Sequence, residues 1–235
     1  MFKTLIINVA ARTERRENMT VRLAEKQING DFIKATEPMN LPLEEKYFLT
    51  RTAESVWRSH WECLKKSSEY TKPTLILEDD AVINFSKKDI ESLVEIIEKQ
   101  NLDFIQIGYL TINLAENFSI RLRNIYSFFT RNAIASNLFK VFGFKEVGRA
   151  KTQQWRKALP KDFIVNDIRY GAHCYLVSPR FASEILPLNS PAFLPADDFY
   201  VALGHSKTFK MIRLRKSRSP QDGSPSSFSK RFLLS

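Results

Sequence analysis

The most informative part of the chain is Leu75-Ile76-Leu77-Glu78-Asp79-Asp80, where an apolar run typical of a buried β-strand ends in three consecutive carboxylates. Side chains alternate between the two faces of a strand, so the spacing predicts that Glu78 and Asp80 share one site and that Asp79 points away from it. Hard cations such as Mg²⁺ and Mn²⁺ are commonly held by one or two carboxylates together with substrate phosphates. The stretch therefore indicates a metal-assisted enzyme that acts on a phosphorylated substrate. A solvated acidic turn after a buried strand would show the same pattern.

Strand and helix signals alternate on both sides of this stretch. Apolar runs predict strands at residues 2–9, 31–35 and 103–109. Helical spacing predicts helices at residues 17–26, at 52–67 with Thr50 as the cap, and after Ser86, where Asp89 three positions on resembles a capping box. Such alternation is typical of an α/β fold with a parallel sheet. The first strand is not followed by a glycine-rich phosphate loop, so neither a dinucleotide fingerprint nor a P-loop is predicted.

The second half of the chain is less regular. Residues 110–161 carry no motif that we can place, and we interpret them as an irregular middle insertion. Regular patterns return with a strand at 170–177, a helix that starts at Ser178-Pro179, a short helix from Asp197 or Asp198 to Leu203 that Gly204 ends, and a strand at 209–214. We expect a single catalytic domain over residues 1–215 and a basic tail rich in serine and proline over residues 216–235.

Length and composition fit one globular domain in a reducing compartment. The chain has 235 residues, of which 43% are hydrophobic and 26% charged, which is enough for a substantial core. Its two cysteines, Cys63 and Cys174, have neither metal-binding nor redox spacing. The opening segment lacks the length of a membrane span and the order of a signal peptide. We therefore expect a cytoplasmic protein.

The charge is basic and concentrated near the C-terminus. The formal net charge is +10, and residues 206–235 contain eight basic residues and one acidic residue. Such a patch would attract anionic lipid headgroups, nucleic acid or a phosphorylated ligand through the same Coulomb interaction. A solvated face is the other interpretation.

Several stretches, in this order, resemble glycosyltransferase family 25, which includes bacterial lipopolysaccharide and lipooligosaccharide galactosyltransferases. The matching residues span most of the chain. They are Ile7-Asn8 with Arg12, Arg15, Arg16 and Met19; Leu49-Thr50 with Glu54 and Ser59-His60; Leu77-Glu78-Asp79-Asp80; Gly171 with Tyr175 and Ser178; and Pro195-Ala196-Asp197. The resemblance implies a GT-A type, Rossmann-like nucleotide-sugar-binding fold, a donor such as UDP-galactose, a divalent metal (Mn²⁺ or Mg²⁺) and inversion at the anomeric carbon.

With this resemblance, the acidic stretch becomes a donor site. Open α/β sheets bind ligands at the carboxyl ends of their strands. We expect Asp80 to bind the metal directly and Glu78 or Asp79 to contact the ribose or a metal-bound water, with Asp79 also a candidate ligand. His205 is a candidate to complete the coordination, and a loop histidine is the alternative.

Other residues are expected to bind the donor or to act on the acceptor. Asp197, with Asp198 beside it, is the expected base for the acceptor hydroxyl, and helix capping is the alternative for Asp197. The expected donor-binding set is Asn8, Arg12, Arg16, Glu54 and His60. Guanidinium groups after the first strand can pair with phosphate, although at least one of Arg12, Arg15 and Arg16 is expected to be solvated. His60 is either near the diphosphate or a satisfied core residue.

These residues lead to one main hypothesis and two alternatives. The main hypothesis is a metal-dependent, inverting glycosyltransferase that moves a hexose, expected to be galactose, from a UDP-sugar to a glycan or glycolipid acceptor. It would contact anionic lipid on the inner face of the bacterial inner membrane and would need no nucleic acid. The alternatives are a basic lipid- or nucleic-acid-binding protein whose acidic cluster is structural, and a metal-dependent phosphohydrolase.

Overall fold

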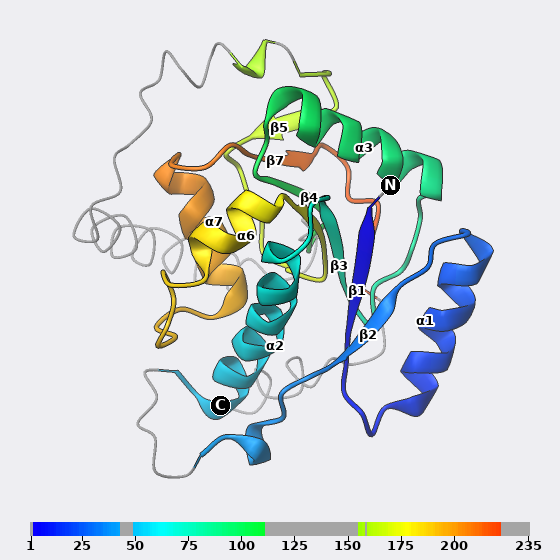
Figure 1. The fold of residues 1–235 in the computed structure, drawn as a ribbon, viewed down its shortest axis with the longest axis vertical. Helices are drawn as coiled ribbons and strands as arrows, with labels where there is room; N and C mark the ends of the chain where they lie inside the picture. Colours follow the sequence, from blue (N-terminus) through cyan, green and yellow to red (C-terminus); the bar gives the residue numbers. More distant parts are fainter. Residues whose placement is uncertain (1, 43–48, 111–154, 158, 222–235) are drawn as a thin grey trace, which may run out of the picture.

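A seven-stranded sheet in the order β2-β1-β3-β6-β4-β7-β5 forms the centre of the protein in its computed structural model, which describes residues 2–42, 49–110, 155–157 and 159–221 (Figure 1). The strands are β1 (Lys3–Asn8), β2 (Asp31–Lys34), β3 (Thr74–Glu78), β4 (Phe104–Gly108), β5 (Phe163–Val165), β6 (Cys174–Val177) and β7 (Met211–Leu214). The helices are α1 (Thr13–Glu25), α2 (Arg51–Ser68), α3 (Lys87–Gln100), α6 (Pro179–Ile185) and α7 (Ala196–Ser206), with a short 3₁₀ turn, η1, at Pro38–Asn40. The predicted Rossmann-like α/β class is confirmed.

The sheet is mostly parallel, with two reversed strands. β1, β2, β3, β4 and β7 point one way, as predicted for the first half of the chain, whereas β6 and β5 run against their neighbours. β6 lies between β3 and β4. Before β6, the chain passes the carboxyl end of β4, where the Leu110 amide donates to the Tyr170 carbonyl. A strand that starts at that edge must run in the opposite direction.

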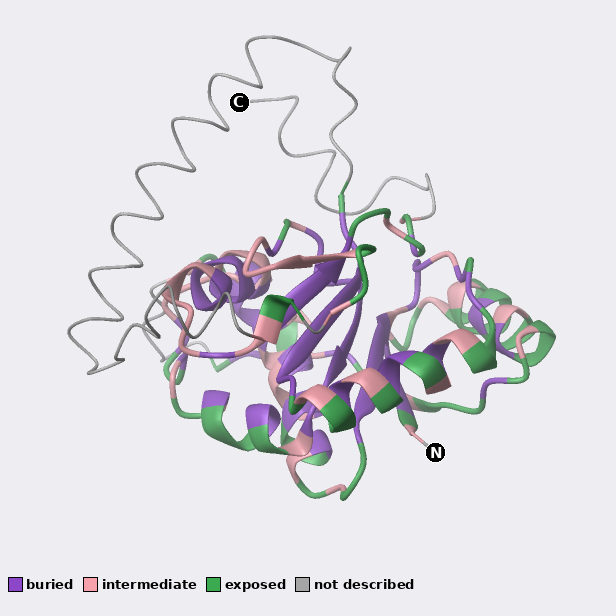
Figure 2. Ribbon diagram, turned by 90° about the horizontal axis from the view of Figure 1, so that it is seen from above, coloured by how far each residue is buried: buried purple, intermediate pink, exposed green. Residues whose placement is uncertain are grey.

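Helices cover both faces of the sheet, and its central strands are buried (Figure 2). Leu75 and Leu77 of β3 pack with apolar residues of α1 and α3 on one face. Ile76 points to the other face, where α2, α6 and α7 supply the core. The continuous apolar sequence of β3 follows from this burial on both sides, which is typical of strands in the middle of an α/β sheet.

Side-chain caps fix the predicted helix starts. Thr50 Oγ1 accepts from the Ala53 amide, and Ser86 and Asp89 form the predicted capping box at α3. Because each cap satisfies amides that the first helical turn leaves unpaired, the chain can enter these helices abruptly. α1 starts at Thr13, four residues before the predicted start.

Helix α7 differs from its prediction at both ends. It begins at Ala196, with Pro195 as its N-cap, and it continues past Gly204 to Ser206, where Lys207 adopts the left-handed conformation. Gly204 therefore does not end the helix. A Cβ at this position would lie 2.8 Å from Ile168 Cγ1, so the glycine is required for close packing.

The first residues of the predicted tail belong to the domain. The carbonyls of Arg218 and Pro220 accept from the amides of Asn84 and Val82, in the loop that follows the acidic stretch, and Ser219 is buried. Basic residues between positions 206 and 221 also bind other groups of the protein. Arg213 is buried and contacts Asp167. Lys210, Arg215 and Arg218 also form hydrogen bonds with protein groups. Residues 222–235 and most of the middle insertion lie outside the described residues. No helix in the described part of the chain is long and apolar enough to cross a membrane.

Candidate active site

Polar residues at the ends of three strands meet at one edge of the sheet. Asn8 ends β1 and Glu78 ends β3; these strands are parallel neighbours with Ile7 opposite Glu78. β6 runs the other way, so His173, just before its first residue, reaches the same edge, and its carbonyl accepts from the Glu78 amide at 2.9 Å. β4 ends beside them at Gly108. The topology thus collects residues far apart in sequence at the carboxyl ends of the central strands, where α/β sheets bind ligands.

A guanidinium group joins the second and third carboxylates of the acidic stretch. Arg15 Nη1 lies 3.1 Å from Asp79 Oδ1 and 3.0 Å from Asp80 Oδ2. Asn8 Nδ2 donates to the other oxygen of Asp79 at 2.8 Å. Both aspartates are buried, so these partners offset part of the cost of holding two like charges side by side.

The predicted pairing of Glu78 with Asp80 is therefore wrong for this structure. β3 ends at Glu78, and Asp79 and Asp80 lie in a turn, where the alternation of a strand no longer holds. Asp79 and Asp80 both contact Arg15 from α1. Glu78 instead contacts His60 from α2, on the opposite face of the sheet.

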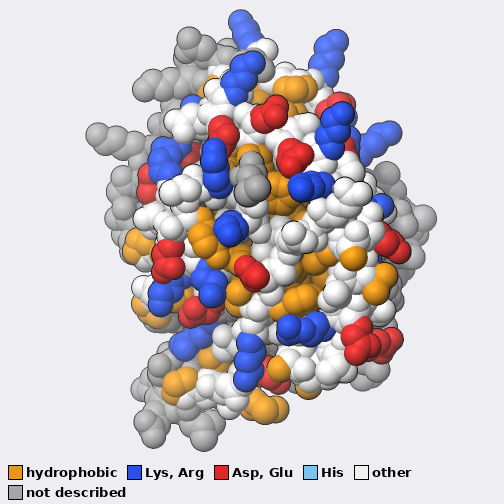
Figure 3. All heavy atoms as spheres, turned by 45° about the vertical axis from the view of Figure 1, so that its right-hand side comes forward, with side chains coloured by type: hydrophobic (Ala, Val, Ile, Leu, Met, Phe, Trp, Pro, Cys, Tyr) orange, Lys and Arg blue, Asp and Glu red, His pale blue; other side chains and the backbone are white. Residues whose placement is uncertain are grey.

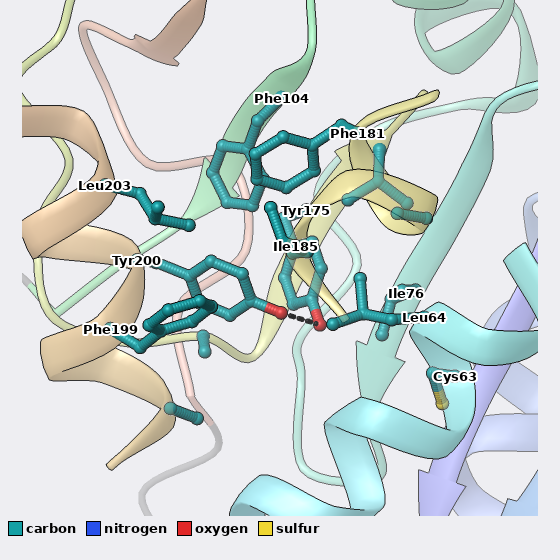
Figure 4. Packing of buried hydrophobic residues seen from close by; sticks show 14 of the residues in the cluster. Cys63, Leu64, Ile76, Phe104, Tyr175, Phe181, Ile185, Phe199, Tyr200 and Leu203 are labelled. Carbon is teal, nitrogen blue, oxygen red and sulfur yellow. Dashed lines mark hydrogen bonds between the residues drawn. The ribbon is translucent and has the colours of Figure 1, made fainter. Parts of the chain in front are cut away.

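Glu78 begins a chain of buried hydrogen bonds. His60 Nε2 lies 3.2 Å from Glu78 Oε1, and His60 Nδ1 lies 2.8 Å from the Tyr175 hydroxyl. The Tyr175 hydroxyl in turn lies 3.0 Å from the Tyr200 hydroxyl, the contact drawn as a dashed line in Figure 4. An ionised carboxylate only accepts, which assigns the proton on Nε2 to the Glu78 contact and makes Nδ1 of a neutral ring the acceptor from Tyr175. Burial raises the pKa of Glu78, but the hydrogen bond from His60 and nearby positive charge, including that of Arg15, together outweigh it, so the pKa of Glu78 lies below its usual value.

Asp197, in the first turn of α7, lies near Glu78 and His60. Its Oδ1 accepts from the Ala172 amide at 2.7 Å, which anchors the carboxylate to the chain entering β6. Burial and the charge of Glu78 raise its pKa to about 6, against the opposing effect of the Ala172 amide and His60. Because Pro195 is the N-cap, the alternative in which Asp197 caps the helix does not describe its contacts.

Two buried polar atoms at this edge lack a hydrogen-bond partner among the described residues: Asp80 Oδ1 and His173 Nδ1. The other ring nitrogen of His173 contacts the Ser219 carbonyl. Burial and the neighbouring charge of Glu78 raise the pKa of Asp80 to about 6. An unpaired buried oxygen is costly, so it is expected where a ligand supplies the missing partner.

The other predicted site residues have different surroundings. Arg12 is the N-cap of α1 and contributes its backbone carbonyl to Asn8. Arg16 lies over the Phe32 ring, 4.3 Å from its centroid, and Glu54 pairs with Arg58 at 2.8 Å. Asp198 is partly exposed beside Asp197.

His205 is at the C-terminal end of α7, about 12 Å along the helix from Asp197 at 1.5 Å per residue. Burial lowers its pKa, and its charged neighbours are Asp167 and Lys207. The structure therefore does not bring His205 to the aspartates at the strand ends.

The expected site lacked His173 and Tyr200, and its donor-binding set contained Arg12 and Arg16 rather than Arg15. Helical spacing does not single out Arg15. Arg15 is four and eight residues before Met19 and Leu23, the buried residues of α1, and Arg16 is three and seven residues before them, so both spacings are typical of the inward face of the helix. The position of His173 depends on the reversed strand β6, which carries no comparable sequence signal.

The oxygen donors at this edge fit a magnesium or manganese ion. Within the described ranges, no group of three or more His, Cys, Asp or Glu side chains is arranged to hold a metal. Mg²⁺, however, is often bound by one or two carboxylates and substrate phosphates. Asp80, with one unpaired buried oxygen, and Asp79 beside it offer that donor set.

The surface offers no single-sign field on the face shown in Figure 3, where Lys and Arg side chains alternate with Asp and Glu. On this face, therefore, no large region of one charge is present, and a local site would have to supply any selectivity for a charged ligand.

The comparison with protein-family models agrees with the motifs. No curated protein matches the chain. Among solved structures, a glycosyltransferase involved in the glycosylation of the major capsid of PBCV-1 is similar, with a TM-score of 0.49 and 8% identity, over 99% of this chain and 97% of that chain. The model of glycosyltransferase family 25, described as an LPS biosynthesis protein, matches residues 1–200. The chain therefore belongs to glycosyltransferase family 25.

Proposed function

We propose that the protein transfers a hexose, galactose in the first instance, from a UDP-sugar to a lipooligosaccharide, lipopolysaccharide or other glycan acceptor, with inversion and with a divalent metal. The observation that carries this proposal is the meeting of Asn8, the acidic stretch and Asp197 at one edge of the sheet in a member of this family. Each element has a distinct task in the reaction.

The donor's diphosphate must be neutralised as it leaves. Asp80 and Asp79 would hold a Mn²⁺ or Mg²⁺ ion, which when bound acts as a Lewis acid on the diphosphate. Asn8 fixes Asp79 through its 2.8 Å hydrogen bond, and the His60-Tyr175-Tyr200 chain fixes Glu78. Glu78, whose side chain is 27% exposed, is available to a ribose hydroxyl.

Asp197 is the proposed base. Inversion requires removal of the acceptor hydroxyl's proton as the new bond forms. A carboxylate with a pKa of about 6 is ionised at neutral pH and accepts a proton more readily than an ordinary aspartate. The Ala172 amide holds one of its oxygens in place.

A thermal-shift screen of nucleotide sugars with and without Mn²⁺ tests the donor and the metal together, because a ligand that binds only the native state raises its stability. We expect UDP-galactose to raise the Tm only when Mn²⁺ is present. UDP release should then rise when a glycan acceptor is added. Release that ignores the acceptor would indicate a hydrolase, and no response to any nucleotide sugar would contradict the proposal.

The membrane contact can be tested separately. We propose that the basic C-terminal segment, including Lys230 and Arg231, binds anionic lipid at roughly 1 kcal/mol per well-placed basic residue. Deleting residues 222–235 should reduce sedimentation with liposomes that contain anionic lipid, and high salt should have the same effect on the full chain. Equal retention of both proteins would contradict this contact.

A further inference from the structure

Arg15 occupies the space between the carboxylates to which the metal is assigned. Its Nη1 is within 3.1 Å of one oxygen of Asp79 and one of Asp80. Asn8 takes the second oxygen of Asp79. Of the four carboxylate oxygens, only Asp80 Oδ1 lacks a partner among the described residues.

A metal ion and this guanidinium cannot use the same two oxygens. Magnesium binds its oxygen ligands at about 2.0–2.1 Å, so an ion held by the two oxygens that Nη1 contacts would compete with Nη1 for them. The two positive charges would also repel each other. An ion can contact Asp80 Oδ1 first, but it engages both carboxylates only if Arg15 leaves.

We infer that Arg15 is an internal counter-cation that holds Asp79 and Asp80 in the donor-free protein and is displaced when metal and donor bind, its guanidinium then pairing with the diphosphate. This inference rests on the metal site proposed above. Arg15 is suited to the exchange because its side chain is 20% exposed and it lies in the first turn of α1, at the rim of the site. Guanidinium groups bind phosphate as well as carboxylate with paired hydrogen bonds.

Metal binding without nucleotide is the direct test. Mn²⁺ affinity would be measured by electron paramagnetic resonance or calorimetry for the wild type, Arg15→Gln and Arg16→Gln. We expect Arg15→Gln to bind Mn²⁺ about tenfold tighter than wild type, since the ion no longer competes with a charge pair. Arg16→Gln removes the same charge from a side chain that lies over Phe32, so it should match the wild type.

UDP affinity is a second measurement, and Arg15→Gln is expected to lower it although the same substitution raises Mn²⁺ affinity. At saturating Mn²⁺, Arg15→Gln should bind UDP several-fold more weakly, because the diphosphate loses its guanidinium partner. Gain for one ligand and loss for the other cannot come from partial unfolding, which would weaken both.

The outcomes separate the inference from the proposed function. Equal or weaker Mn²⁺ binding by Arg15→Gln would overturn the counter-cation role while leaving the metal site in place. Tighter Mn²⁺ with unchanged UDP affinity would overturn the transfer of Arg15 to the diphosphate. If no variant binds Mn²⁺ with or without UDP, the metal site itself is wrong, and the inference falls with it.

Discussion

Replacing Asp197 with asparagine separates a catalytic role from a structural one. The amide keeps the shape of the side chain and an oxygen that can accept from the Ala172 amide. It removes the charge, and with it the ability to take a proton. We therefore expect that Asp197→Asn abolishes sugar transfer and makes the folded protein more stable.

The stability gain follows from the pKa. Burial and the charge of Glu78 raise the pKa of Asp197 to about 6, against 3.8 for an ordinary aspartate. At about 1.4 kcal/mol per pKa unit, ionised Asp197 costs the folded state roughly 3 kcal/mol. Solvent reaches part of the side chain, which reduces this to about 1–2 kcal/mol. For a domain of this size, Asp197→Asn should raise the Tm by about 3–6 °C at pH 8.

The gain must depend on pH in a defined direction. Between the two pKa values the folded state binds more protons at this group than the unfolded state, so stability falls as pH rises from about 4 to about 6. The cost is complete above that range. The advantage of Asp197→Asn should thus shrink to about half at pH 5 and nearly vanish at pH 4.

Thermal unfolding in metal-free buffer at pH 8, 5 and 4 is the assay, with UDP-sugar turnover measured in parallel. Loss of a general base should lower kcat by about 10²–10⁴-fold. Asp89→Asn is the matched control, because hydrogen bonds from Ser86 lower the pKa of Asp89 and the same substitution there should reduce the Tm. A lower Tm for Asp197→Asn at pH 8, or transfer within a few-fold of wild type, would refute the reasoning.

Two further substitutions test the packing around the site. Tyr175→Phe removes the hydroxyl that contacts His60 and Tyr200 in the core, so it should lower the free energy of unfolding by about 1–3 kcal/mol, measured by urea titration. Tyr70→Phe is the control, and equal effects of the two substitutions would mean that the hydroxyl network contributes nothing. Gly204→Ala would place a methyl 2.8 Å from Ile168 Cγ1, and overpacking of this kind costs about 1–3 kcal/mol. A neutral or stabilising result by thermal unfolding would show that the helix adjusts freely there.

Local signals in the sequence were sufficient for most of the fold. Thr50, Ser86 and Ser178 start their helices as their spacing predicts, because a cap acts within one turn of the chain. The apolar runs of β1, β3 and β4 fall where they were expected, since burial on both faces demands them. The predicted helix end at Gly204 was wrong, because a glycine required for close packing against a residue distant in sequence cannot be distinguished in the sequence from one that ends a helix.

The sequence by itself determined the α/β class, the helix starts and the carboxylates at the end of β3, because periodicity, capping and burial act between near neighbours in the chain. Only the tertiary structure decided the partners of those carboxylates. Arg15 lies more than sixty residues from Asp79, and His173 reaches the site because β6 runs backwards between β3 and β4. Contacts of this kind depend on the order and direction of strands, which are set by the packing of the whole sheet rather than by any local pattern.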